Sequence, residues 1–163
     1  MTMTDTPTEI ITPVGEPVIH TRRFFKAPPE LVYRALTEPE YMRRWFGPRR
    51  LEITVCEADL RVGGSWRVVH RAPDGTEFRF HGEFLELDPP RKRVGTFVYE
   101  GAPEHVATET MVCEPVDGGT MLLSTMVHDS VEARDMHLAS GMEEGILDSY
   151  SRLDELVAEE LAR

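Results

Sequence analysis

The sequence predicts an α+β fold, in which a seven-stranded antiparallel sheet is covered by one long C-terminal helix and two short helices lie between the first and second strands. Three observations lead to this prediction. Segments with strand character follow one another between turn residues, residues 131–163 carry a helical repeat of apolar side chains, and prolines bound two short helical segments near the start of the chain.

Prolines mark the ends of the first strand and of the two short helices. Residues 18–27 have strand character up to Pro28, and Pro29 suits the first turn of a helix. Pro39 interrupts that helix and can open a second, short one that runs through Trp45. The first of the two helices has apolar residues at helical spacing: Leu31, Val32, Ala35 and Leu36.

Six further strand segments follow Pro48, each separated from the next by a turn signal. Pro73-Asp74-Gly75 indicates a hairpin, and Pro89-Pro90 cannot lie inside a central strand. Because the connections are short, we predict that consecutive strands pair as an antiparallel meander. The segments are 51–58, 64–72, 76–88, 93–100, 105–115 and 120–128.

The C-terminal helix is expected to begin near Val131, because Asp129 and Ser130 are N-cap residue types and Glu132 stands three residues after Asp129. It either continues to the C-terminus or breaks near Gly141. Large apolar residues at spacings of three and four predict one buried face: Met142, Ile146, Tyr150, Leu153, Val157 and Leu161. A row of small residues runs beside them and either eases packing on the sheet or leaves space unfilled: Gly141, Gly145 and Ser149.

Length and composition limit the domain organisation. With 163 residues, the chain is expected to form a single domain over residues 17–163. Residues 1–16 are rich in Thr, Pro and Glu without a hydrophobic period, so we expect a flexible tail there. Cys56 and Cys113 are far apart in sequence, and we interpret both as buried strand residues without a redox role.

Charge and hydropathy exclude several classes of function. A net charge of −11 argues against nucleic-acid binding, which depends on Lys and Arg that neutralise phosphates. No segment approaches the roughly 18 apolar residues that cross a bilayer, so we expect no integral membrane association. The N-terminal residues lack the basic start and apolar run of a secretory signal. The expected location is therefore the cytoplasm.

Three segments together resemble a known family. They are FKAPPELVYRALTEPEYMRRWFGP, VCEADLRVGGSWRVVHRAPDGTEFRFHGEFLELDPPRKRV and GMEEGILDSYSRLDELVAE, and the resemblance covers roughly residues 18–160. The chain resembles the bacterial branch of the START-related helix-grip superfamily that is related to the activator of heat shock protein 90 ATPase. The chain departs from the branch at Phe46, where a second tryptophan is common, and at Met142, where many members carry tryptophan.

The resemblance implies a sheet that curves around the long helix, with a cavity between them that receives an apolar small molecule. Related folds include ligand carriers, polyketide cyclases and aromatases, and co-chaperones, so the fold by itself does not decide the function. Related domains commonly dimerise, and the sequence leaves a homodimer open. We expect Met142, Ile146 and Tyr150 to form the wall that faces the ligand, and the candidate ligand-binding residues are Trp45, Trp66, His70, His81, Tyr99, Met111, Met142, Ile146 and Tyr150.

The turn at Asp74-Gly75 bears on the placement of two of these candidates. If it is a tight two-residue turn, His70 and His81 share one face of the sheet with Trp66, and the opposite face carries Phe78 and Phe80. A β-bulge near Phe84-Leu85 would shift the faces. The sequence therefore leaves open whether the histidines line the cavity or face water.

Few signals point to catalysis. Two histidines without a third ligand predict no metal site, and no nucleotide-binding motif indicates a cofactor. Three functions remain open. The leading one is a small-molecule binding module. The second is a cyclase-like or aromatase-like enzyme that uses the same cavity, and the third is a protein-interaction domain whose contact surface is RRWFGPRR, with Arg43, Arg44, Arg49 and Arg50.

Overall fold

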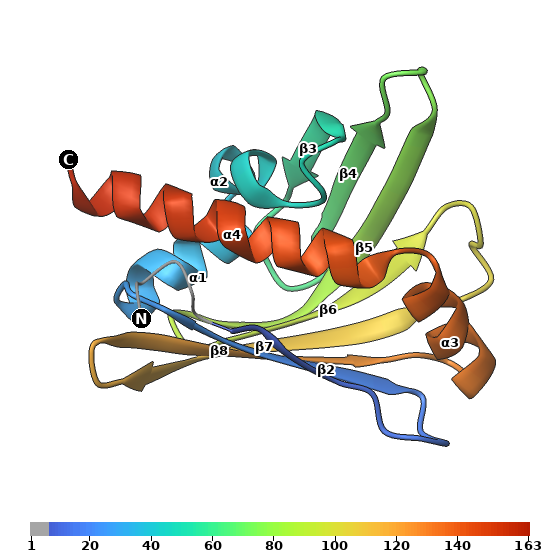
Figure 1. Ribbon diagram of the computed structural model, residues 1–163, viewed down its shortest axis with the longest axis horizontal. Coiled ribbons are helices and arrows are strands. Elements are labelled where there is room, and N and C mark those ends of the chain that lie inside the picture. The colour runs from blue at the N-terminus through green and yellow to red at the C-terminus, as the bar shows by residue number, and fades with distance from the viewer. Residues whose placement is uncertain (1–6) are drawn as a thin grey trace.

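The structure is a computed structural model that describes residues 7–163. An eight-stranded antiparallel sheet with the order β1-β2-β8-β7-β6-β5-β4-β3 bends around a long helix, α4, which lies along its concave side (Figure 1). The strands are β1 Glu9–Ile11, β2 Val18–Phe25, β3 Glu52–Ala58, β4 Ser65–Arg71, β5 Glu77–Asp88, β6 Lys92–Tyr99, β7 Ala107–Val116 and β8 Gly119–Val127. The helices are α1 Pro29–Thr37, α2 Pro39–Trp45, α3 Val131–Ala139 and α4 Met142–Leu161.

The predicted α+β architecture is confirmed, including the helix pair between the first two long strands. Proline occupies the first turn of both α1 and α2, where a missing N–H costs nothing. The pair is held by its own contacts, because the indole Nε1 of Trp45 donates to the carbonyl of Ala35 at 2.7 Å. Figure 1 shows α1 and α2 close to the C-terminal half of α4, opposite the end where α3 lies.

The sheet has one strand more than the sequence predicted. Glu9–Ile11 pairs antiparallel with β2, so this part of the expected tail forms β1. Three residues are too few to show the alternation that predicts a strand. Residues 1–6 of the expected tail lie outside the described residues.

The observed pairing of β4 with β5 differs by one residue from the pairing that a two-residue turn would give. Ala72 and Thr76 flank a three-residue loop in which Gly75 has φ +92°, the left-handed residue of a turn followed by a bulge. His70 therefore pairs with Phe78, and His81 pairs with Arg67. The extra loop residue places His70 on the concave face and His81 on the convex face, so the two histidines are on opposite sides of the sheet.

Two other irregularities agree with the sequence. The bulge expected near Phe84-Leu85 is present, because the β5–β6 register shifts between Phe84 and Glu86. The C-terminal helical region breaks at Gly141, whose φ of +91° ends α3 and precedes α4. Helix α3 begins at Val131 as predicted, and its N-cap is Ser130, whose Oγ accepts from the amide of Ala133 at 3.0 Å.

The core lies between α4, the helix pair and one end of the sheet. Its largest fully buried side chains include Phe25, Phe84, Leu122 and Leu153. Cys56 and Cys113 are buried and unpaired, as expected for strand residues. None of the helices in residues 7–163 combines the length and the apolar character that crossing a membrane requires.

Candidate functional site

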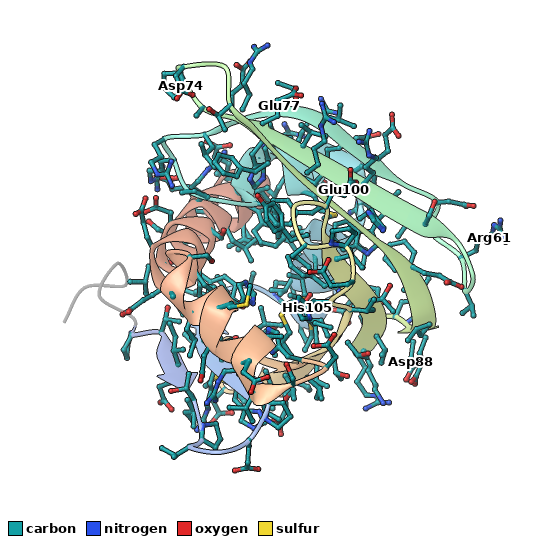
Figure 2. The ribbon with its side chains drawn as sticks, turned by 90° about the vertical axis from the view of Figure 1, so that its right-hand side faces the viewer. Arg61, Asp74, Glu77, Asp88, Glu100 and His105 are labelled. Carbon is teal, nitrogen blue, oxygen red and sulfur yellow. The ribbon has the colours of Figure 1, made fainter. Side chains whose placement is uncertain are left out.

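A cavity of about 530 Å³ separates the first half of α4 from the concave face of the sheet. Its walls come from α4, α3, the end of α2 and strands β2, β4, β5, β6, β7 and β8, and the loop between β6 and β7 borders it. Figure 2 views the molecule from the α3 end and labels His105 of that loop, which contacts Asp129 just before α3. The side chains that line the cavity include Thr21, Trp45, Phe46, His70, Phe78, Phe80, Phe97, Tyr99, His105, Glu109, Met111, Ser124, His128, His137, Met142, Ile146, Ser149 and Tyr150.

One wall is a continuous row of aromatic rings. The ring centroids of Phe46 and His70 are 5.4 Å apart, and those of His70 and Phe80 are 5.6 Å apart. The row continues from Phe80 to Phe97 at 5.4 Å and from Phe97 to His137 at 5.9 Å. These separations are typical of favourable ring contacts, so the wall presents a firm apolar surface.

His70 acts in this wall as a neutral ring. It is 3% exposed, and its Nε2 is buried without a hydrogen-bond partner among the described residues. Burial, with a smaller effect of the Arg152 charge, lowers the pKa of His70 to about 4. The ring lies against Gly47, where a Cβ would approach His70 Cε1 to 2.3 Å. Any larger residue at position 47 would therefore displace the imidazole.

Tyr150 of α4 reaches the sheet across the cavity. Its hydroxyl lies 3.3 Å from Thr21 Oγ1 on β2, and its ring meets Phe25 edge to face with the centroids 5.6 Å apart. Burial raises the pKa of Tyr150 to about 12. The phenol is therefore protonated at neutral pH and can donate or accept a hydrogen bond.

The floor of the cavity carries a carboxylate that the sequence analysis did not select. Glu109 on β7 accepts from Arg93 Nη1 at 3.3 Å and from Ser124 Oγ at 3.4 Å. Gly95 lies opposite Glu109 in the β6–β7 ladder, and a Cβ at residue 95 would lie 3.5 Å from Arg93 Nη2. The signal in the sequence was the two-residue period of a strand, because Glu109 lies two and four residues before Met111 and Cys113 and therefore shares the inward face of β7 with them.

Three histidines lie at the α3 end of the cavity. His128 Nε2 and His137 Nδ1 are 3.0 Å apart, and His105 Nδ1 lies 3.1 Å from a carboxylate oxygen of Asp129. Burial lowers the pKa of both His128 and His137, and that of His137 is lowered to about 4. Among residues 7–163, no three His, Cys, Asp or Glu side chains are arranged to hold a metal ion.

Seven of the nine predicted ligand-binding residues line the cavity: Trp45, His70, Tyr99, Met111, Met142, Ile146 and Tyr150. Trp66 is buried on the same sheet face but packs over Gly82, where a Cβ would lie 2.4 Å from its Nε1. His81 faces outward and its Nδ1 lies 3.0 Å from a carboxylate oxygen of Glu100, which is labelled in Figure 2. The one-residue change in register accounts for the position of His81.

The small residues of α4 border the cavity. Gly145 has space around it, because a Cβ there would meet only Pro48 Cδ, at 3.8 Å. Ser149 Oγ accepts from the amide of Gly47 at 2.7 Å, which ties the end of the helix pair to α4. Both residues line the cavity, as does Gly141 at the helix break.

The arginines of RRWFGPRR make contacts within the chain. Arg44 pairs with Glu159 and Glu160, Arg49 with Glu155, and Arg50 with Glu144, and all four carboxylates belong to α4. Arg43 donates to the carbonyl of Cys56 at 3.3 Å. The pairs of Arg44, Arg49 and Arg50 fasten α2 and the segment after it to α4, whereas Arg43 joins α2 to β3.

The comparison with known proteins identifies the family. The model of the family described as "Activator of Hsp90 ATPase homolog 1-like protein" matches residues 26–158. This chain belongs to that family. The match confirms the resemblance to the heat shock protein 90 ATPase activator branch of the START-related superfamily. No curated protein matches the sequence of the chain.

Solved structures of other bacterial proteins share the architecture of this family member. A protein from Rhodobacter sphaeroides is 28% identical with a TM-score of 0.86, and the alignment covers 94% of this chain and 99% of that one. A protein from Nitrosomonas europaea is 30% identical with a TM-score of 0.80, covering 90% and 97%. The fold is also that of the AHSA1-like protein from Aeromonas hydrophila, at 24% identity and a TM-score of 0.69, covering 86% and 94%.

Proposed function

We propose that this protein binds an apolar or amphipathic small molecule in the cavity between α4 and the sheet. The cavity itself is the observation that carries the proposal. Its volume of about 530 Å³ falls within the range of roughly 300–1,000 Å³ that small-molecule sites occupy. Most of its lining is apolar, with polar groups on the sheet and at the α3 end, as expected for a site that binds by burial and orients by hydrogen bonds.

The arrangement of small residues supports the same function. Gly145 leaves open space beside Pro48, although glycine in a helix costs about 0.5–1 kcal/mol relative to alanine. Close packing against the sheet would place sheet atoms near that position, but among the described residues the only atom outside α4 within 4 Å of a Cβ there is Pro48 Cδ, which does not belong to the sheet. Because Gly145 has no side chain, this part of α4 leaves volume free in the cavity that the residue lines.

The enzyme alternative depends on His70 and Tyr150, which line one cavity. A cyclase-like or aromatase-like reaction would need one of them to move a proton. His70 is neutral at pH 7 with its Nε2 covered, and Tyr150 is a very weak acid. Tyr150 suits hydrogen bonding to a ligand and His70 contributes a neutral ring to the wall, so binding without turnover remains the leading function.

The co-chaperone alternative depends on the four arginines. Because Arg44, Arg49 and Arg50 pair with carboxylates of α4, their charges are partly matched within the chain. A partner that used this surface would compete with those pairs. A homodimer and a cytoplasmic location remain predictions from the sequence.

Native mass spectrometry of the freshly purified protein tests the proposal, followed by denaturing release of anything bound. We expect a discrete additional mass that is lost on denaturation and is apolar on extraction. A mass of the bare chain alone, together with no binding of uncharged apolar probes up to millimolar concentration, would contradict the proposal.

A further inference from the structure

We propose that the floor of the cavity selects ligands with a neutral hydrogen-bond-donating head, such as a phenol or an alcohol, and rejects carboxylates. This inference rests on the proposed function, because it names the chemical class of ligand for the same cavity. The residues that carry it are Glu109, Ser124 and Arg93 on the sheet. Thr21 pairs with Ser124 across β2 and β8, and its hydroxyl lies 3.3 Å from that of Tyr150.

Glu109 has acceptor capacity to spare. A carboxylate offers about four lone-pair positions, and Glu109 accepts two hydrogen bonds from the described residues, at 3.3 and 3.4 Å. Its side chain lines the cavity and is 16% exposed, whereas the Arg93 side chain is 6% exposed and does not line the cavity. The guanidinium is therefore covered, and a ligand meets the carboxylate.

The hydroxyl groups near the carboxylate favour the same class of head group. Ser124 donates its proton to Glu109, so its oxygen presents lone pairs to the cavity. Tyr150 and Thr21 bond to each other, which leaves one of the two hydroxyl protons for other partners. A ligand hydroxyl can donate to Glu109 and accept from this hydroxyl pair.

Charge decides between neutral and ionised ligands. Arg93 already balances the Glu109 charge, so a cationic head would lose its hydration without an unmatched anion to compensate. A carboxylate head on the sheet floor would lie against Glu109, and no Lys or Arg of the described strands lines the cavity there. Arg50, which also lines the cavity, lies outside the sheet, is 58% exposed and is paired with Glu144. A neutral donor avoids both penalties.

The test compares three naphthalenes of similar size at pH 7: 2-naphthol, 2-methylnaphthalene and 2-naphthoate. Fluorescence titration of each ligand with the full chain gives three dissociation constants. We expect 2-naphthol to bind at least about tenfold more tightly than either of the others. The hydroxyl and the methyl group fill nearly the same space, so their ratio measures the hydrogen bond.

The double variant Arg93→Met with Glu109→Leu supplies the control. Replacing both members of a buried ion pair by apolar residues is often neutral for stability, whereas Glu109→Gln alone would strand the Arg93 charge. In the double variant, 2-naphthol and 2-methylnaphthalene should bind within about twofold of each other. Circular dichroism and thermal melting show whether the double variant is folded. The ratio of the dissociation constants of 2-methylnaphthalene and 2-naphthol in the wild type tests the inference even if the variant does not fold.

The outcomes separate this inference from the proposed function. Equal binding of all three ligands, or tightest binding of 2-naphthoate, would overturn the inference and leave the cavity as a ligand site. A naphthol preference that survives in the folded double variant would also overturn it, because the selectivity would then come from other groups. Absence of binding of all three ligands up to their solubility would overturn the proposed function and the inference with it.

Discussion

The buried imidazole of His70 makes the stability of the protein depend on pH. In the unfolded chain its pKa is expected near 6.5, and in the folded protein it is about 4. Between these values the unfolded state binds a proton that the folded state does not. Stability contributed by the neutral ring is therefore fully present above about pH 6.5 and is lost as the pH falls toward 4.

The size of this effect follows from the difference in pKa. One pKa unit corresponds to about 1.36 kcal/mol, so the fall from 6.5 to about 4 corresponds to roughly 3 kcal/mol of unfolding free energy. His128 and His137 also have lowered pKa values and add to the pH dependence of the wild type. A comparison with His70→Leu isolates the contribution of His70.

The assay is urea unfolding of the wild type and of His70→Leu at several pH values between 7 and 4. The difference in unfolding free energy between the two proteins should shift by about 3 kcal/mol in favour of the variant across this range. A difference that stays constant with pH would show that His70 titrates alike in the folded and unfolded states, and would refute the burial argument.

Two further predictions concern residues that hold the site in place. Gly47→Ala should lower stability by more than about 2 kcal/mol in thermal unfolding, because φ is +93° and its Cβ would meet His70 Cε1 at 2.3 Å. Gly63→Ala is the control, because φ there is +86° and no described atom beyond the two adjacent residues lies within 4 Å of an added Cβ, so this variant should lose only about 1–2 kcal/mol through backbone strain. Equal losses of stability in Gly47→Ala and Gly63→Ala would contradict a steric clash with His70. Asp154→Asn should cost about 1.5–3 kcal/mol in urea unfolding, because the Arg23 side chain is 5% exposed and its charge loses its partner, while Asp154 itself is 30% exposed. Glu155→Gln removes an exposed partner of Arg49 and should cost under about 1 kcal/mol, so a similar loss in the two variants would argue against a special role for burial.

Local signals predicted most of the fold. Prolines at 29 and 39 marked α1 and α2, and strand-like segments between turn residues marked the seven longer strands close to their observed bounds. The sequence left open whether the C-terminal helix continues to the end of the chain or breaks near Gly141. The structure has the break, because Gly141 adopts a left-handed backbone conformation. The short β1 escaped prediction because it is defined by its pairing with β2 and not by its own pattern.

The site was less predictable because it depends on register across the sheet. Asp74-Gly75 fits both a two-residue and a three-residue loop, and the choice decides which face carries His81. Glu109 was missed because a charged strand residue usually faces water. Its inward position depends on Arg93, sixteen residues earlier, and on Gly95 opposite it, which only the β6–β7 ladder brings together.

Filling the cavity from α4 tests the central claim most directly. Binding of the uncharged fluorescent probe N-phenyl-1-naphthylamine would be titrated with the wild type, Gly145→Ala and Gly145→Leu. The alanine adds a Cβ at ordinary contact distance from Pro48 and is expected to leave the dissociation constant within about twofold, while favouring the helix. The leucine extends into the space that residue 145 lines, so the account predicts at least about tenfold weaker binding by a folded protein. Equal binding by the leucine and alanine variants, both folded, would contradict the claim that ligands occupy this cavity.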